Sequence, residues 1–209
     1  MVEYLRAIKR PFTDLGKLII GIILTTIPIA NFAVVGYWLE CAKTSMKINY
    51  KLPDWKMSYF WEGIMIALIA FGYLTAIFII LGIILRESFW VAIKNFEGIS
   101  ITTLKNLSLA NWSFSVIIMT LLFLLVYYIF TIAILKYVTD KSFGSLFQFG
   151  DIFKKAFTVT YFKIWLIMTI YMVTLQIIFD YVPYIGTSIA TFIGQVSFFT
   201  AIGKIYPKL

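Results

Sequence analysis

The sequence contains no histidine and one cysteine, Cys41, among its 209 residues. A single cysteine excludes a disulfide within the chain. The absence of histidine removes the side chain that most often binds metals and transfers protons near neutral pH. The sequence also lacks a glycine-rich phosphate loop, a metal-binding Cys/His spacing and a Gly-x-Ser-x-Gly motif. We therefore expect a protein that is not an enzyme and that needs no metal or cofactor.

Charged residues are also scarce. They make up 13% of the chain, whereas hydrophobic residues make up 61% and aromatic residues 19%. Soluble domains are about half apolar and a quarter charged, and a chain of this length has too little interior to hide the surplus. The sequence therefore predicts an integral membrane protein whose partner is membrane lipid. The net charge is +8. The Lys and Arg residues lie in short segments beside the apolar blocks, and there is no polar domain, so we expect no nucleic-acid partner.

Long apolar blocks alternate with short charged segments along the whole chain. A helix of about 20 apolar residues crosses a bilayer core of about 30 Å, and in lipid a helix satisfies its own backbone. We predict a single membrane domain over 1–209, an all-α polytopic helix bundle. Its hydrophobic helices, about six, are expected near 11–27, 31–46, 59–85, 113–137, 160–181 and 185–204.

Two segments between the blocks are amphipathic and too polar to cross. We predict interfacial amphipathic helices near 88–107 and 143–157. In the second, the apolar side chains at helical spacing are Leu146, Phe149, Phe153 and Phe157. Each helix either contacts lipid or a partner, or is a connector that lies on the bilayer.

The first apolar block carries Pro28 near its centre, in the stretch "TIPIAN" that begins at Thr26. A proline kinks a continuous helix, and it also suits a turn between two helices. A hairpin places 15 of the 18 Lys and Arg residues on the inner side of the membrane, against 11 for a single span. Cytoplasmic loops carry the positive excess. We therefore predict a short hairpin in the cell membrane with both termini cytoplasmic, leaving a re-entrant hairpin and one kinked span as alternatives.

A few polar residues lie inside or at the ends of the apolar blocks. Gln176 and Gln195 are the deepest amides, and Asp180 lies one helical turn after Gln176. Glu40 lies near the inner end of the second arm. Polar groups in lipid either line a pathway or join helices by hydrogen bonds. These four residues are our candidates for a polar lining or for interhelical contacts.

The last apolar block carries a stripe of small residues at helical spacing: Gly186, Ala190, Gly194, Ser197 and Ala201. Small residues let another helix approach closely. The stripe serves either packing within the chain or contact in a homo-oligomer, and the sequence does not choose between them.

Several short motifs, in this order, resemble domain-of-unknown-function family 4013, whose members are small multi-span membrane proteins of archaea and bacteria. The motifs contain Gly36, Tyr37, Pro53, Trp55, Gly63, Tyr137, Pro183, Gly186, Gly203 and Tyr206, together with the segment "FGSLFQFGDIFKKAF". The resemblance implies the multi-span architecture. It implies no catalytic or binding residues, because the family has no established activity.

Two functional hypotheses follow. The scarcity of buried charge favours a non-enzymatic subunit or scaffold of a membrane assembly. A pattern of an apolar block, a basic segment and a second apolar block occurs twice in the chain. This faint repeat, together with Gln176 and Gln195, favours a small oligomeric channel or carrier instead. The low Cys and His content, with abundant Ile, Lys and Tyr, is typical of an archaeal source.

Overall fold

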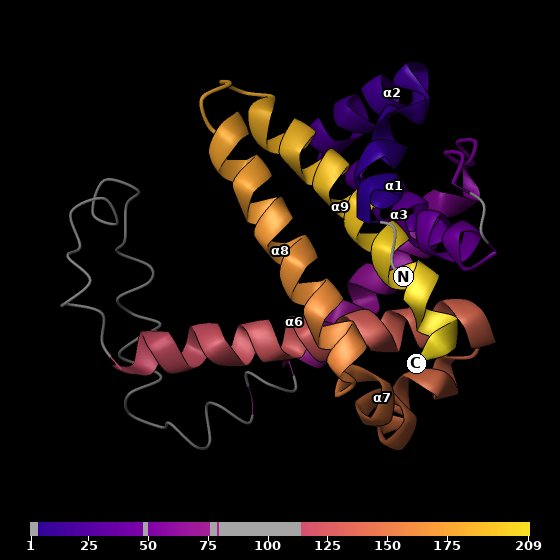
Figure 1. The fold of residues 1–209 in the computed structure, drawn as a ribbon, viewed down its shortest axis with the longest axis vertical. Coiled ribbons are helices and arrows are strands. Elements are labelled where there is room, and N and C mark those ends of the chain that lie inside the picture. Colours follow the sequence, from indigo (N-terminus) through magenta and orange to yellow (C-terminus); the bar gives the residue numbers. More distant parts are fainter. Residues whose placement is uncertain (1–3, 48–49, 76–78, 80–113) are drawn as a thin grey trace. The chain divides into compact units, whose positions relative to one another are not determined.

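The computed structural model describes residues 4–47, 50–75, 79 and 114–209 (Figure 1). These residues form helices, turns and irregular loops, and none of them forms a strand. In this described part of the chain, four helices are long and apolar enough to cross a membrane: Ser58–Thr75, Thr120–Asp140, Val159–Phe179 and Gly186–Lys208. The predicted interfacial helix near 88–107 lies outside the described residues.

The chain divides into two compact units, residues 1–67 with 129–209, and residues 68–128. The contacts reported below lie within the first unit. Of the second unit, the structure describes the end of the helix that begins at Ser58 and the first half of the helix that ends at Asp140.

The N-terminal segment is broken into short pieces before its first apolar helix. α1 spans Tyr4–Lys9, a 3-10 turn η1 spans Arg10–Thr13, and α2 spans Leu15–Thr26. The predicted start of a continuous helix at residue 11 is therefore wrong. Asp14 has extended backbone, and its side chain caps α2 by accepting a hydrogen bond from the backbone N–H of Lys17 at 3.1 Å.

The stretch around Pro28 is a turn. α2 ends at Thr26, residues 27–30 turn, and α3 spans Asn31–Met46. At 1.5 Å per residue, the two helices are about 18 Å and about 24 Å long. Neither is among the four helices that could cross by length and composition. The structure therefore has a hairpin here, with arms shorter than the other hydrophobic helices.

The second half of the chain runs from α6, Phe114–Asp140, to α8, Val159–Phe179. Between them lie a 3-10 turn η3, Phe143–Phe147, and the short helix α7, Phe149–Ala156. The range predicted as one interfacial helix is thus two elements. Leu146 is buried in η3, whereas Phe149, Phe153 and Phe157 are exposed, so these residues do not share one face.

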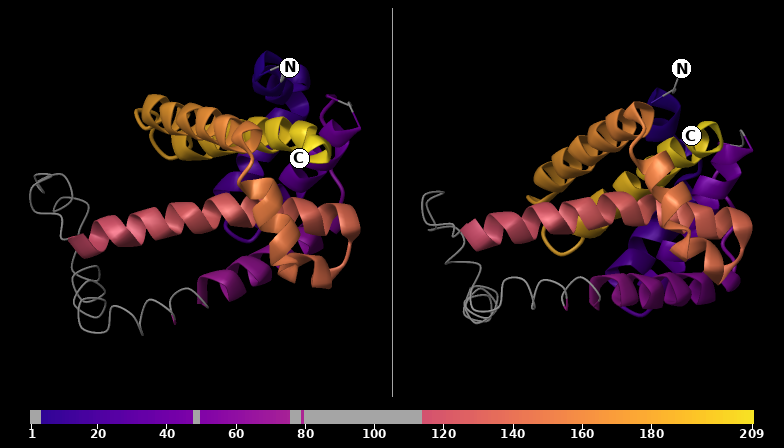
Figure 2. Two further views of the ribbon diagram at one scale, coloured as in Figure 1. Left: turned by 60° about the horizontal axis from the view of Figure 1, so that its bottom comes forward. Right: turned by 90° about the horizontal axis from the view of Figure 1, so that it is seen from below.

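The last helix, α9, spans Gly186–Ile205 and is followed by a 3-10 turn η4, Tyr206–Lys208. It forms a hairpin with α8 through an exposed turn that contains Pro183 and Tyr184 (Figures 1 and 2). α9 also packs against α3, α2 and α1. It is the central helix of the first unit, and the functional candidates are arranged around it.

Candidate functional site

The small-residue stripe on α9 is buried within the chain. All five of its members are inaccessible. A side chain at Gly194 would meet Met172 of α8 at 3.0 Å, and one at Gly203, on the same helix, would collide with the backbone of Ala42 in α3. The stripe therefore lets α9 approach its neighbours in the same chain, and it is not available for contact with a second copy.

The two deep glutamines do not bond to each other. The Gln176 amide Nε2 donates to the Thr191 hydroxyl at 3.0 Å, which joins α8 to α9. The Gln195 carbonyl Oε1 is buried and has no hydrogen-bond partner among the described residues. Asp180 caps the end of α8 and is exposed. Glu40 lies apart from all three, on α3, in an ion pair with Lys43 at 3.2 Å. The four predicted residues do not form one site.

Arg10 forms the most extensive buried polar contact in the described part of the chain, and sequence analysis did not single it out. Its side chain is fully buried. One terminal nitrogen donates to the Cys41 carbonyl at 2.6 Å and to the Thr200 hydroxyl at 2.9 Å. The other donates to the Thr44 hydroxyl at 2.6 Å and to the Lys51 carbonyl at 2.9 Å. One guanidinium therefore joins η1, α3, the following loop and α9.

Arg10 is held by neutral acceptors. No described carboxylate forms an ion pair with it. Burial lowers the pKa of the Arg10 guanidinium, and neighbouring groups, Cys41 first among them, act in the opposite direction. An arginine stays protonated even so, so the bundle contains a permanent positive charge at this joint.

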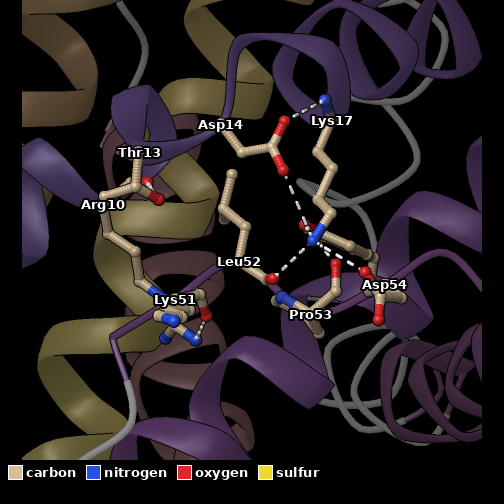
Figure 3. A network of polar contacts seen from close by, with 9 residues as sticks. Arg10, Thr13, Asp14, Lys17, Lys51, Leu52, Pro53 and Asp54 are labelled. Carbon is tan, nitrogen blue, oxygen red and sulfur yellow. Dashed lines mark hydrogen bonds and ion pairs between the residues drawn. The ribbon is translucent and has the colours of Figure 1, made fainter.

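A second polar network lies beside the first, at the start of α2 (Figure 3). The Lys17 ammonium contacts Asp54 Oδ1 at 2.8 Å and Asp14 Oδ2 at 3.4 Å, and it donates to the Leu52 carbonyl at 2.9 Å. The hydrogen bond from Lys17 lowers the pKa of the Asp54 carboxyl. This network ties the loop after α3 back to the beginning of α2, so the two arms of the hairpin run antiparallel.

The motif residues of the inner loop serve packing. The Tyr37 hydroxyl donates to the Pro53 carbonyl at 3.1 Å, and the Tyr37 ring stacks on Trp55 with centroids 4.1 Å apart. Both rings also contact Phe192 of α9. Side chains at Gly36 and Gly63 would collide with the backbone of Tyr59 and Phe32, respectively. These glycines allow α3 and the helix Ser58–Thr75 to approach backbone to backbone.

α7 is fixed on both of its sides by lysine contacts. The Lys136 ammonium of α6 contacts Asp151 Oδ2 at 3.1 Å. The Lys155 ammonium donates to the Tyr206 carbonyl at 3.2 Å and lies 4.3 Å from the centroid of the Tyr206 ring. Ile152 and Ala156 face the core. α7 is therefore held in one orientation.

The outward side of this segment carries a row of phenylalanines: Phe147, Phe149, Phe153 and Phe157. Consecutive rings lie 6.4, 6.2 and 6.0 Å apart. All four are exposed, by 41% to 66% of their surface. The row is thus turned away from the protein core.

A pocket of about 190 Å³ opens at the end of α3 and is our candidate functional site. Its lining residues are Leu39, Glu40, Lys43, Glu62, Tyr137, Val138 and Lys141. They come from α3, from the first turns of the helix Ser58–Thr75, and from the end of α6. Glu40 was predicted from the sequence as a lining or contact residue and Tyr137 as a family motif residue, but the pocket itself was not predicted.

Two glutamates and two lysines line this pocket, and among the described residues only one glutamate and one lysine form an ion pair. Glu40 and Lys43 form the ion pair described above. Glu62 and Lys141 form no ion pair or side-chain hydrogen bond with any other residue that the structure describes. Lys141 follows the last turn of α6 in a left-handed conformation, with φ of 50°. The pocket is therefore electrically balanced but has one available carboxylate and one available ammonium.

Over the described residues, the fold and these sites define an all-helical protein in which four helices could span a membrane. The profile of a family described as "Protein of unknown function (DUF4013)" matches residues 19–201. The chain belongs to this family, as its motifs led us to expect. No curated protein and no solved structure matches it.

Proposed function

We propose that this protein is a non-enzymatic integral membrane protein that serves as a subunit or scaffold of a membrane assembly. It would reside in the cell membrane with both termini in the cytoplasm. The distribution of basic residues supports this orientation, since with six hydrophobic helices a hairpin around Pro28 would keep 15 of the 18 Lys and Arg residues on one side.

The observation that carries the proposal is the use of buried polar groups as joints between helices. Arg10 connects α3 and α9, and Gln176 connects α8 and α9. Close glycine contacts reinforce the same helix pairs. A transporter moves its helices against one another around a central site. A bundle fixed by a four-bonded arginine suits a static component better.

Gentle extraction from native membranes, followed by sizing and mass spectrometry of co-purifying proteins, tests this role. We expect a stoichiometric membrane partner and no ion or solute flux from the purified chain in liposomes. A homogeneous homo-oligomer that conducts or transports would contradict the proposal.

We further propose that α7 is an interfacial helix that rests on the lipid headgroup region. In the sequence α7 lies between α6 and α8, both of which are long enough to span a membrane. The phenylalanine row faces outward beside Lys154, which is also exposed. Aromatic rings on a basic helix are typical of an interfacial position. A nitroxide at Phe153→Cys, in a Cys41→Ser background, should lie at shallow bilayer depth. If the nitroxide were as accessible to a water-soluble relaxant as a nitroxide in bulk water is, this proposal would be contradicted.

One observation favours the second candidate, a small oligomeric channel or carrier. The Gln195 carbonyl is buried and without a partner in the described part of the chain, and such a group is able to coordinate a passing ion or solute. If the protein transports, leucine at both Gln176 and Gln195 should abolish flux in liposomes. Unchanged flux would exclude this lining.

A further inference from the structure

We propose that the pocket at the end of α3 binds a zwitterion that carries a primary amine and a phosphate, as an ethanolamine phospholipid headgroup does. Glu62 would receive the ammonium, and Lys141, with help from Lys43, would receive the phosphate. This inference rests on the pocket's geometry and does not depend on the subunit role proposed above.

The arrangement of charges in the pocket indicates the charges of its ligand. Glu62 and Lys141 line the same cavity, yet among the described residues they pair neither with each other nor with a neighbour. Glu40 and Lys43, on the same pocket, do pair, at 3.2 Å. The unpaired acid and base are therefore complementary to a ligand that carries both charges.

The size and the lining of the pocket indicate the size of its ligand. A volume of about 190 Å³ is smaller than the roughly 300–1,000 Å³ of pockets for drug-sized ligands. It therefore suits a headgroup-sized molecule. Leu39 and Val138 give the pocket an apolar wall, against which a short methylene linker between amine and phosphate can rest.

The location of the pocket favours a lipid headgroup. The pocket is formed where α6 ends and where the helix Ser58–Thr75 begins. Both helices could span a membrane, so their ends lie at the depth of lipid headgroups. Lysines between spanning helices at this depth bind lipid phosphates, and Lys43 and Lys141 supply them here. The carboxylate of Glu62 adds a requirement for an amine.

Native mass spectrometry of the purified full chain tests the proposal with three probes. A short-chain ethanolamine phospholipid should bind, and a glycerol phospholipid of equal chain length should bind about tenfold more weakly, since it lacks the ammonium that Glu62 would receive. Soluble O-phosphoethanolamine identifies the source. If it competes at similar concentration, the ligand is a free aminoalkyl phosphate, and if it does not, the ligand is the lipid.

Two pocket variants and one control complete the experiment. Glu62→Gln keeps shape and removes charge, and it should bring the ethanolamine lipid down to the level of the glycerol lipid. Lys141→Gln should weaken both lipids. Lys163→Gln, an exposed change on α8 outside the pocket, should alter neither. Equal binding of both lipids, binding unchanged by Glu62→Gln, or no binding by any probe would overturn the proposal. The melting temperature of each variant identifies any that fails to fold.

Discussion

Helices α8 and α9 are nearly equal in length, at 21 and 20 residues, and one short turn joins them. Both qualify as spans by hydropathy. Yet only 17% of the α8 span is buried inside the protein, against 78% of the α9 span. The two halves of one hairpin therefore have different roles. α8 presents its side chains outward, and α9 forms the core of the first unit.

The difference lies in residue size and in the placement of polar atoms. The exposed side chains of α8 are large and apolar, among them Phe162, Leu166 and Ile170. The buried positions of α9 include glycines and hydroxyls, such as Gly203 and Thr200. Lipid is as apolar as leucine, so hydrophobicity alone does not bury a membrane helix. Close approach and hydrogen bonds decide which helix becomes central.

The strongest way to break the central role of α9 is Arg10→Met. It would leave the acceptors Cys41 O, Lys51 O and the hydroxyls of Thr44 and Thr200 without their buried donor. The Thr44 and Thr200 hydroxyls keep their hydrogen bonds to Glu40 O and Val196 O, but four bonds from a charged donor are lost. A hydrogen bond to a charged group contributes about 1.5–3 kcal/mol, so we expect a loss of about 3 kcal/mol or more in the free energy of unfolding. Unfolding in mixed detergent micelles measures it.

The matched control is Lys9→Met, an exposed change at the preceding residue. It should leave stability within about 0.5 kcal/mol of the original. Arg10→Lys should recover only part of the loss, because an ammonium lacks the planar fork that reaches four acceptors. Full stability in Arg10→Met would show that the guanidinium is not a structural joint.

A bulky side chain at a close helix contact should have the next largest effect. Gly203→Leu would force α9 away from the backbone of α3 at Ala42. Overpacking of this kind costs about 1–3 kcal/mol. Gly72→Leu is the matched control, since a side chain there meets nothing within 4 Å. It should be neutral or stabilising, by up to about 1 kcal/mol, because leucine favours helix over glycine. If Gly203→Leu and Gly72→Leu changed the free energy of unfolding equally, close packing would not distinguish α9 from an exposed helix.

Much of this arrangement is readable from the sequence. Pro28 and the positions of the lysines and arginines predicted the turn that separates α2 from α3. The small residues of the last block predicted a helix that others approach closely. These features depend on local composition and on spacing, which a sequence displays directly.

Arg10 was not predictable in the same way. It lies among other flanking cations, and its bonding partners are 31, 34, 41 and 190 positions away. The pocket likewise combines three distant segments. The break at Asp14 did have a local signal, a capping residue three positions before Lys17. So did the division of 143–157, which contains two glycines, Gly144 and Gly150.

A smaller effect is expected from the hydrogen bond between the two compared helices. Gln176→Leu and Thr191→Val each remove one side of the contact at 3.0 Å. Interhelical hydrogen bonds in membranes contribute about 0.6 kcal/mol on average. We expect each single change to cost about that much and the double change to cost little more. Fully additive losses would indicate that the two side chains act independently.

The smallest effect concerns the exposed counterpart of the Arg10 joint, the ion pair between Lys17 and Asp54. The folded-state pKa of Asp54 is lowered by the hydrogen bond from Lys17. The stabilisation is therefore present above the unfolded carboxyl's pKa of about 3.9 and is lost as the pH falls through the lower folded value. Asp54→Asn should accordingly lower the melting temperature slightly at pH 7, and this difference should shrink as the pH falls below about 3.9 and vanish below the folded-state pKa. Because Asp54 is exposed, high salt should also reduce the difference. In a Lys17→Met background the same substitution should have no pH-dependent effect, and a persistent one would assign the stabilisation to another partner of Asp54.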